Sequence, residues 1–243
     1  MAPIDSFVRL RYTARLPNGP RSRDVPRPER HIVRRIGDII SFMHDGIDHD
    51  GLYRLAESQA GYFTAGQALG AGMDRSTLRH HARSGGRYER VRRGLYRLRH
   101  FPTSPHEHVV AAWLPLRGAG GVVSHESALE LYELSDVVPD AVHISLDRAK
   151  RGQRPRPGVR IHSLERPPGA SETREVSGVP ATTPERSIVD ALESGYQPEQ
   201  IELAIRQALE RGLATRRRLR AEASERSARV RALVERATAG APA

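Results

Sequence analysis

The side chains best suited to act on a partner molecule are arginines, with a serine and a histidine among them, in one short stretch. Arg75, Arg79 and Arg83 are four residues apart, so in a helix they form one stripe. Ser76 and His80 belong to the same outward-facing side. Guanidinium, hydroxyl and imidazole groups on one short helix can reach the phosphates and base edges of a DNA major groove.

Positive charge is concentrated around this stretch. Residues 75–99 contain nine arginines and one acidic residue, a net charge of +8, whereas residues 101–213 contain twelve basic and sixteen acidic residues, a net charge of −4. Lys150 is the only lysine of the chain, so the number of arginines alone reflects a coding bias. Such a bias does not separate charge along the chain, and a positive field confined to one segment is expected of a nucleic-acid-binding protein.

The pattern around these residues predicts two short helices joined by a glycine turn. Asp74 is placed to cap the second helix, since its carboxylate can accept hydrogen bonds from the first-turn N–H groups. Leu78 faces the core from that helix. Residues 61–64 are expected to be a break, and Thr64 is placed to cap a shorter helix over residues 65–69. Two such helices around a turn are typical of a helix-turn-helix.

A basic hairpin follows the second helix. Polar and apolar residues alternate on both sides of Arg93 and Gly94, which predicts two short strands and a basic tip, or wing. An edge hairpin whose charges prevent aggregation would show a similar pattern. We predict a winged helix-turn-helix over residues 46–100. Its expected base-edge contacts are Arg75, Ser76, Arg79 and His80, and its expected phosphate contacts are Arg83, Arg90, Arg92 and Arg93.

The remaining chain is predicted to form an N-terminal extension, a second folded domain and a C-terminal tail. Residues 1–45 form a Pro- and Arg-rich, partly disordered extension, with a helical apolar pattern at 31–44. Residues 101–213 alternate short strands and helices, which predicts an α+β domain with a small sheet and flanking helices. Among these we expect a helix over residues 105–116, a strand over 174–179, and a helix capped by Thr183 with Pro184 at its first position. Residues 214–243 carry a net charge of +5 and few apolar residues, so we predict a basic tail that is helical at most. The fold class is therefore α+β.

Residues that suggest catalysis fit structural roles better. Ser124 and His125 suggest a hydrolase, but neighbouring residues rarely bring a hydroxyl to an imidazole, and Ser124 is placed to cap a helix. Lys150 lies near Asp147 in a Pro/Gly-rich loop, without the acid-any-lysine triplet of a nuclease. Arg186 and Asp190 are four apart on a predicted helix and are expected to form an internal ion pair. We therefore expect no catalytic residue and no enzyme.

Metal binding and membrane insertion are also disfavoured by the sequence. The neighbouring pairs His80/His81 and His106/His108 point apart on a helix, and the chain has no cysteine, so we expect no metal site and no cofactor. No apolar run approaches the roughly 20 residues of a membrane span, and no signal peptide is visible. With a net charge of +10, the chain is expected to be a cytoplasmic protein without a membrane partner.

Three segments in the first half resemble a known family. Residues 61–68 (GYFTAGQA), 78–85 (LRHHARSG) and 88–98 (YERVRRGLYRL) are similar to the N-terminal domain of AbiEi-like antitoxins of type IV, or abortive-infection, toxin–antitoxin systems. Further similar segments follow at 123–129, 142–146 and 178–190. The resemblance covers roughly residues 50–212.

The resemblance implies a transcriptional regulator that binds repeats in its own promoter. It also implies an antitoxin that opposes a nucleotidyltransferase-type toxin, functionally if not through a stable contact. Two alternatives remain. The second domain would sense a small ligand in one, and it would bind and neutralise the toxin protein directly in the other.

Overall fold

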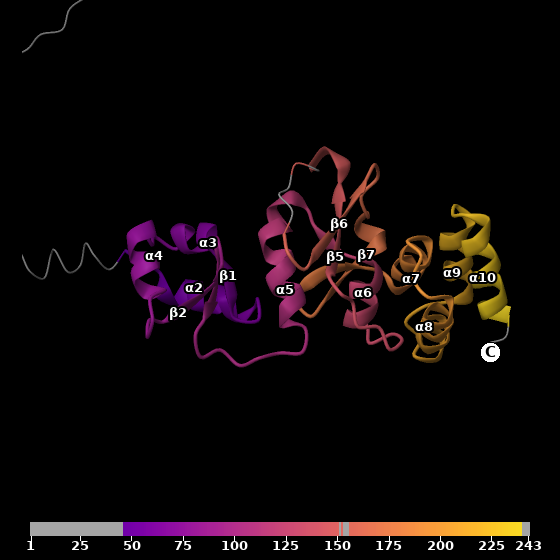
Figure 1. The fold of residues 1–243 in the computed structure, drawn as a ribbon, viewed down its shortest axis with the longest axis horizontal. Coiled ribbons are helices and arrows are strands. Elements are labelled where there is room, and N and C mark those ends of the chain that lie inside the picture. Colours follow the sequence, from indigo (N-terminus) through magenta and orange to yellow (C-terminus); the bar gives the residue numbers. More distant parts are fainter. Residues whose placement is uncertain (1–45, 151, 153–155, 240–243) are drawn as a thin grey trace, which may run out of the picture. The chain divides into compact units, whose positions relative to one another are not determined.

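The structure of this chain is a computed structural model that describes residues 46–150, 152 and 156–239 (Figure 1). The chain divides into two units, residues 1–45 and residues 46–243. The predictions for the N-terminal extension, including the helical pattern at 31–44, lie outside the described residues. No helix among the described residues combines the length and the apolar composition needed to cross a membrane.

The first part of the described chain forms the predicted winged helix-turn-helix. Its elements are α2 (His49–Glu57), β1 (Tyr62–Thr64), α3 (Ala65–Gly70), α4 (Arg75–His81), β2 (Tyr88–Arg92) and β3 (Leu95–Leu98). The three strands form an antiparallel sheet in the order β1-β3-β2. Thr64 caps α3 as predicted, and the Gln67 side chain completes a capping box by accepting from the Thr64 N–H at 2.7 Å.

Strand β1 corrects the sequence analysis, which indicated only a break between α2 and α3. Tyr62 and Phe63 are buried, and the three residues of β1 pair with β3 from Tyr62↔Arg97 to Thr64↔Leu95. A strand of three residues with two consecutive buried side chains is too short to show an alternating pattern. Its pairing with β3 comes from the tertiary fold.

The second part is built on a five-stranded mixed sheet, which confirms the predicted α+β class. The sheet order is β6-β5-β4-β8-β7, with parallel pairs β5/β6 and β4/β8 and antiparallel pairs β4/β5 and β7/β8. Its strands are β4 (Val122–Val123), β5 (Val142–Asp147), β6 (Val159–Leu164), β7 (Thr173–Val176) and β8 (Val179–Thr182). The single strand expected over 174–179 is thus a hairpin of β7 and β8.

Helices of this second part follow the predicted pattern with shifted boundaries. The α-helices are α5 (Glu107–Trp113), α6 (His125–Leu131), α7 (Pro184–Glu193), α8 (Pro198–Glu210), α9 (Arg216–Ser224) and α10 (Ala228–Ala239), and three short 3₁₀ helices lie at Leu114–Ala119, Arg148–Lys150 and Ala170–Glu172. The helix expected from Pro105 to Leu116 is therefore shorter, and its last part is 3₁₀. Thr183 caps α7 as predicted, with Pro184 at the first position.

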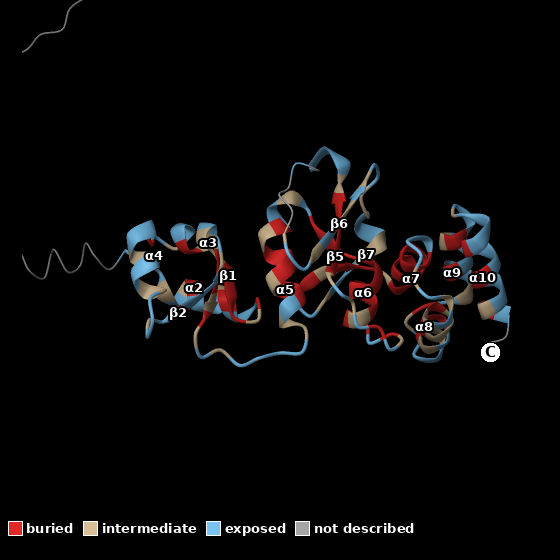
Figure 2. Cartoon of the chain, viewed as in Figure 1, coloured by how far each residue is buried: buried red, intermediate tan, exposed pale blue. Residues whose placement is uncertain are grey.

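The segment after residue 213 was predicted as a basic tail, helical at most; it does form the helices α9 and α10, but these pack into the core and are not a separate tail. Leu219 of α9 and Val234 of α10 are fully buried and belong to the same core as the five-stranded sheet. Figure 2 shows this inward face of both helices as buried and their other faces as exposed. The sequence pattern was misleading because alanines such as Ala223 supply part of the apolar face, leaving few large apolar residues.

A buried ion-pair network reaches from α7 to α9. The guanidinium of Arg186 lies 3.0 Å from the carboxylate of Asp190, as predicted, and 2.6 Å from that of Glu172. It also approaches Glu222 of α9 at 3.7 Å, and Arg226 bridges Asp190 and Glu222 at 2.8 and 3.1 Å. Arg226 therefore accounts for part of the basic composition after residue 213, because it forms ion pairs within the fold.

The expected cap by Ser124 is also absent. Ser124 precedes α6, but its hydroxyl makes no capping bond. Instead its Oγ lies 2.9 Å from Nδ1 of His125 and accepts a hydrogen bond from Ser145 at 2.8 Å. These adjacent residues do bring hydroxyl and imidazole together, unlike the expectation from the sequence, and His125 has a left-handed φ of +54°.

The packing of α9 can be tested by truncating Leu219. Because this side chain is fully buried, Leu219→Ala is expected to lower the free energy of unfolding by about 2–5 kcal/mol. Arg229→Ala, an exposed change on α10, is the matched control and is expected to stay within about 0.5 kcal/mol. Urea denaturation followed by circular dichroism measures both, and equal midpoints would contradict the assignment of α9 to the core.

Candidate nucleic-acid interface

Helix α4 begins with a well-formed cap. The carboxylate of Asp74 accepts hydrogen bonds from the backbone N–H groups of Ser76 and Thr77, each at 2.7 Å, and from the Ser76 hydroxyl at 2.7 Å. The hydrogen bonds from Thr77 and Ser76 lower the pKa of Asp74 to about 2. The predicted cap is therefore confirmed, and it fixes the position at which α4 starts.

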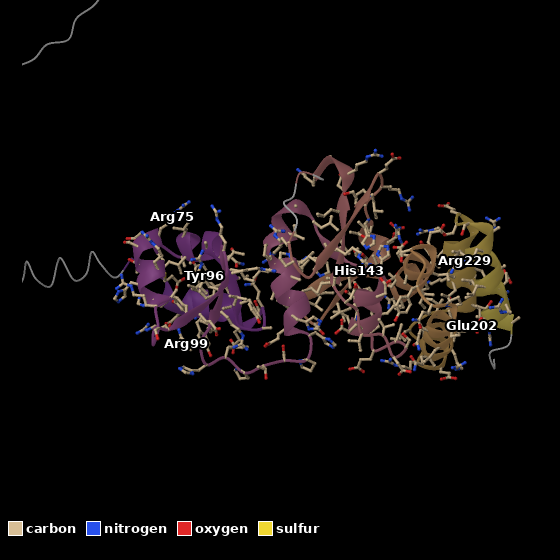
Figure 3. The ribbon with its side chains drawn as sticks, viewed as in Figure 1. Arg75, Tyr96, Arg99, His143, Glu202 and Arg229 are labelled. Carbon is tan, nitrogen blue, oxygen red and sulfur yellow. The ribbon has the colours of Figure 1, made fainter. Side chains whose placement is uncertain are left out.

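The two faces of α4 differ in the way the sequence predicted. Leu78 and the preceding Met73 are buried in the core of the winged part. Arg75, Arg79 and His80 are exposed. Figure 3 shows Arg75 at the surface beside α4. The amphipathic helix thus keeps its cationic side chains in solvent because its apolar residues are committed to the core.

The hairpin has the predicted basic tip. Strands β2 and β3 pair from Tyr88↔Leu98 to Arg92↔Leu95, with a bulge between Arg90 and Arg92. Gly94 has a φ of +78°, a conformation that a glycine adopts without strain. Its carbonyl accepts from the N–H of Ala65 at 2.9 Å, which ties the tip to the start of α3. Arg90 and Arg93 are exposed.

Not every arginine of the basic segment is available to a partner. Arg99 donates to the backbone carbonyls of Gly86, Arg83 and Tyr88 at 2.6, 3.2 and 3.0 Å, so it holds the start of the hairpin to the end of α4. Arg97 pairs with Glu107 at 3.0 Å. The net charge counted from the sequence therefore overstates the charge that faces solvent.

Arg92 differs from the other predicted phosphate contacts. Its guanidinium donates to the carbonyl of Ala111 in α5 and is only partly exposed. Burial, and then the nearby charge of Arg156, lower the pKa of Arg92. The predicted phosphate contact stays a prediction, but this side chain also joins the hairpin to the second part of the chain. Strand alternation alone does not reveal that a neighbouring helix covers one side of β2.

Part of the chain is similar to a known family. Residues 52–99, from α2 through β3, match the family model described as "Transcriptional regulator, AbiEi antitoxin". This segment resembles AbiEi antitoxin regulators. No curated protein sequence matches the chain. The solved structure of the RV2827C protein from Mycobacterium tuberculosis is similar over 79% of this chain and 80% of that one, with 15% sequence identity and a TM-score of 0.46.

Arg87 is a further exposed cation near the hairpin that was not among the contacts predicted from the sequence. Arg87 lies immediately before β2 and is exposed. With Arg90 and Arg93 it brings an additional positive charge to the hairpin. Its position between α4 and the hairpin could have identified it from the sequence. The alternation of polar and apolar residues does not, because Arg87 precedes the strand. The predicted base-edge and phosphate roles of all these residues stay predictions.

The cap of α4 gives a pH-dependent prediction. Because the folded-state pKa of Asp74 is depressed, its stabilising effect is full above the unfolded value near 4 and is lost as the pH falls through about 2. Asp74→Ala should therefore lower the melting temperature at pH 7, with a difference from wild type that disappears between about pH 4 and 2. Asp74→Ser, which retains a capping oxygen, should stay close to wild type at pH 7. A difference that is constant with pH would contradict this role.

The placement of Arg92 predicts a separation of stability from DNA binding. Arg92→Ala should lower the free energy of unfolding by about 1 kcal/mol through loss of its hydrogen bond to Ala111. It should leave the salt dependence of DNA affinity unchanged, since the guanidinium is already engaged. Chemical denaturation and fluorescence anisotropy measure the two effects. A lower salt slope for Arg92→Ala would favour the phosphate contact.

Proposed function

We propose that this chain is a sequence-specific DNA-binding regulator that represses its own operon and acts as the antitoxin of a toxin–antitoxin pair. The observation that carries the proposal is the exposed cationic face of α4, held by the Asp74 cap and followed by a basic hairpin. The match of residues 52–99 to AbiEi antitoxin regulators supports the same function. Its site of action is the cytoplasm, where the promoter DNA lies.

Helix α4 is proposed to enter the major groove. Arg75, Arg79 and His80 contact base edges from its exposed face, because arginine matches guanine and histidine can donate to or accept from a base. Ser76 already donates its hydroxyl to Asp74 at 2.7 Å, so it accepts a hydrogen bond from a base or a water molecule.

The remaining exposed arginines are proposed to hold the DNA backbone. Arg83 follows α4, and Arg87, Arg90 and Arg93 belong to the hairpin region. Contacts to phosphate fix the register of the protein but carry no sequence information. Each contact releases counterions, so each contributes to the decrease of affinity with salt.

We also propose that this chain counteracts a toxin. The family model names an antitoxin, and the resemblance implies a nucleotidyltransferase-type toxin as the partner. Expression of that toxin from a heterologous promoter, with and without this chain, tests the proposal by growth. Use of a heterologous promoter separates neutralisation from repression, because the chain then has no operator to bind. Unchanged toxicity in the presence of the chain would limit its function to regulation.

The two groups of arginines should differ in a DNA-binding assay. Arg79→Ala should weaken binding to the operator by about 1–3 kcal/mol and reduce the preference over scrambled DNA. Arg93→Ala should weaken binding to both sequences alike and lower the slope of log K against log salt by about one. Fluorescence anisotropy across a salt series measures both quantities.

The matched control is Arg206→Ala, which removes an exposed arginine from α8, outside the proposed interface. It should leave affinity and slope unchanged. If Arg79→Ala and Arg93→Ala behave identically on both sequences, the assigned roles are wrong. If Arg206→Ala weakens binding as much as either, the interface itself is misplaced.

A further inference from the structure

Three histidines from separate elements meet in the second part of the chain. His125 is the first residue of α6, His143 lies in β5 and His162 lies in β6. One ring nitrogen of each lies within 4.8 Å of the corresponding atoms of the other two. His125 and His143 are buried and His162 is half-buried. Figure 3 labels His143, which lies in the interior of this part of the fold.

The fold brings these residues together through one strand pair and one helix start. In the parallel pair of β5 and β6, His162 lies opposite Ser145, two residues after His143, so the two histidines share a face of the sheet. His125 reaches that face with a φ of +54°. A non-glycine residue in the left-handed region is uncommon, and such residues gather at functional sites.

Each of the two buried rings already has a partner at Nδ1. The carboxylate of Glu126 lies 2.5 Å from Nδ1 of His143, and the Ser124 hydroxyl lies 2.9 Å from Nδ1 of His125. Histidines that bind metal commonly have a carboxylate or another polar group at one ring nitrogen, which orients the ring.

The three rings lie close to one another. The rings of His125 and His162 are stacked, with centroids 3.6 Å apart and planes 15° apart, and Nε2 of His162 lies 3.4 Å from Nδ1 of His143. The ring centroids of His143 and His162 are 5.0 Å apart, so each ring of the cluster neighbours the other two.

We propose that His125, His143 and His162 bind one divalent transition-metal ion of the class that prefers imidazole ligands, such as Zn²⁺. Binding turns the His125 and His162 rings out of their stack, so that one nitrogen of each faces the ion. Three histidine ligands leave a fourth position for water or a partner group. The ion would join α6 to β5 and β6, which are the elements around which the second part is built. The three histidines are far apart in the sequence, so their spacing along the chain does not reveal the set.

Metal binding by the full-length chain tests the proposal. The protein is stripped with a chelator and titrated with Zn²⁺ by calorimetry and with Co²⁺ by visible absorption. We expect one ion per chain, and visible bands of a Co²⁺ site with fewer than six ligands. A folded chain that binds neither ion, or whose Co²⁺ spectrum is that of the hexahydrated ion, would overturn the proposal.

Variants locate the ion. His162→Gln removes the least buried ligand and should weaken Zn²⁺ binding by about 100-fold or more, while Glu126→Gln should weaken it about 10- to 100-fold through loss of the outer carboxylate. His100→Gln, which changes an exposed histidine just after β3, is the control and should bind as wild type. Circular dichroism confirms that each variant is folded. Wild-type affinity in the folded His162→Gln variant would place the ion elsewhere and contradict the assignment.

Discussion

Strand β3 is the element on which both parts of the described chain depend. It is the central strand of the β1-β3-β2 sheet, so its backbone is hydrogen-bonded on both sides. Its side chains are also divided between two cores. Leu95 belongs to the core of the second part, together with Tyr62, whereas Tyr96 and Leu98 belong to the core of the winged part. Every side chain of β3 packs or pairs within the fold. The proposed contacts with a partner therefore come from α4 and the hairpin tip.

The same constraint divides the arginines. Three arginines on or beside β3 bond within the fold: Arg97 pairs with Glu107, Arg99 donates to three backbone carbonyls, and Arg92 donates to Ala111. Guanidinium groups suit this work because they offer several donors in a fixed plane. Arginines farther from the shared core, such as Arg75 and Arg93, remain exposed. The positive charge that this segment exposes therefore depends on where each arginine lies in the fold as well as on the number of arginines.

The sequence predicted the local features and missed those that depend on distant contacts. The caps at Thr64 and Asp74 could be predicted because a cap involves only three or four consecutive residues. Strand β1 could not, since its pairing partner lies about thirty residues away and its three residues show no alternation. The packing of α9 and α10 into the core was missed because small alanines supply part of their buried faces. The histidine cluster is spread over β5, β6 and the start of α6, so only the sheet register brings it together.

The central claim is that the exposed face of α4 and the hairpin recognise a particular DNA sequence. Fluorescence anisotropy of the wild-type chain with the DNA upstream of its own gene, against a scrambled duplex over a range of salt concentrations, tests this claim most directly. We predict tight binding to the upstream DNA with a steep salt dependence. Binding to the scrambled duplex is expected to be weaker by a factor of about 10³ or more. Equal, weak binding to both duplexes would show that the basic surface provides only general attraction to DNA, and would contradict the account.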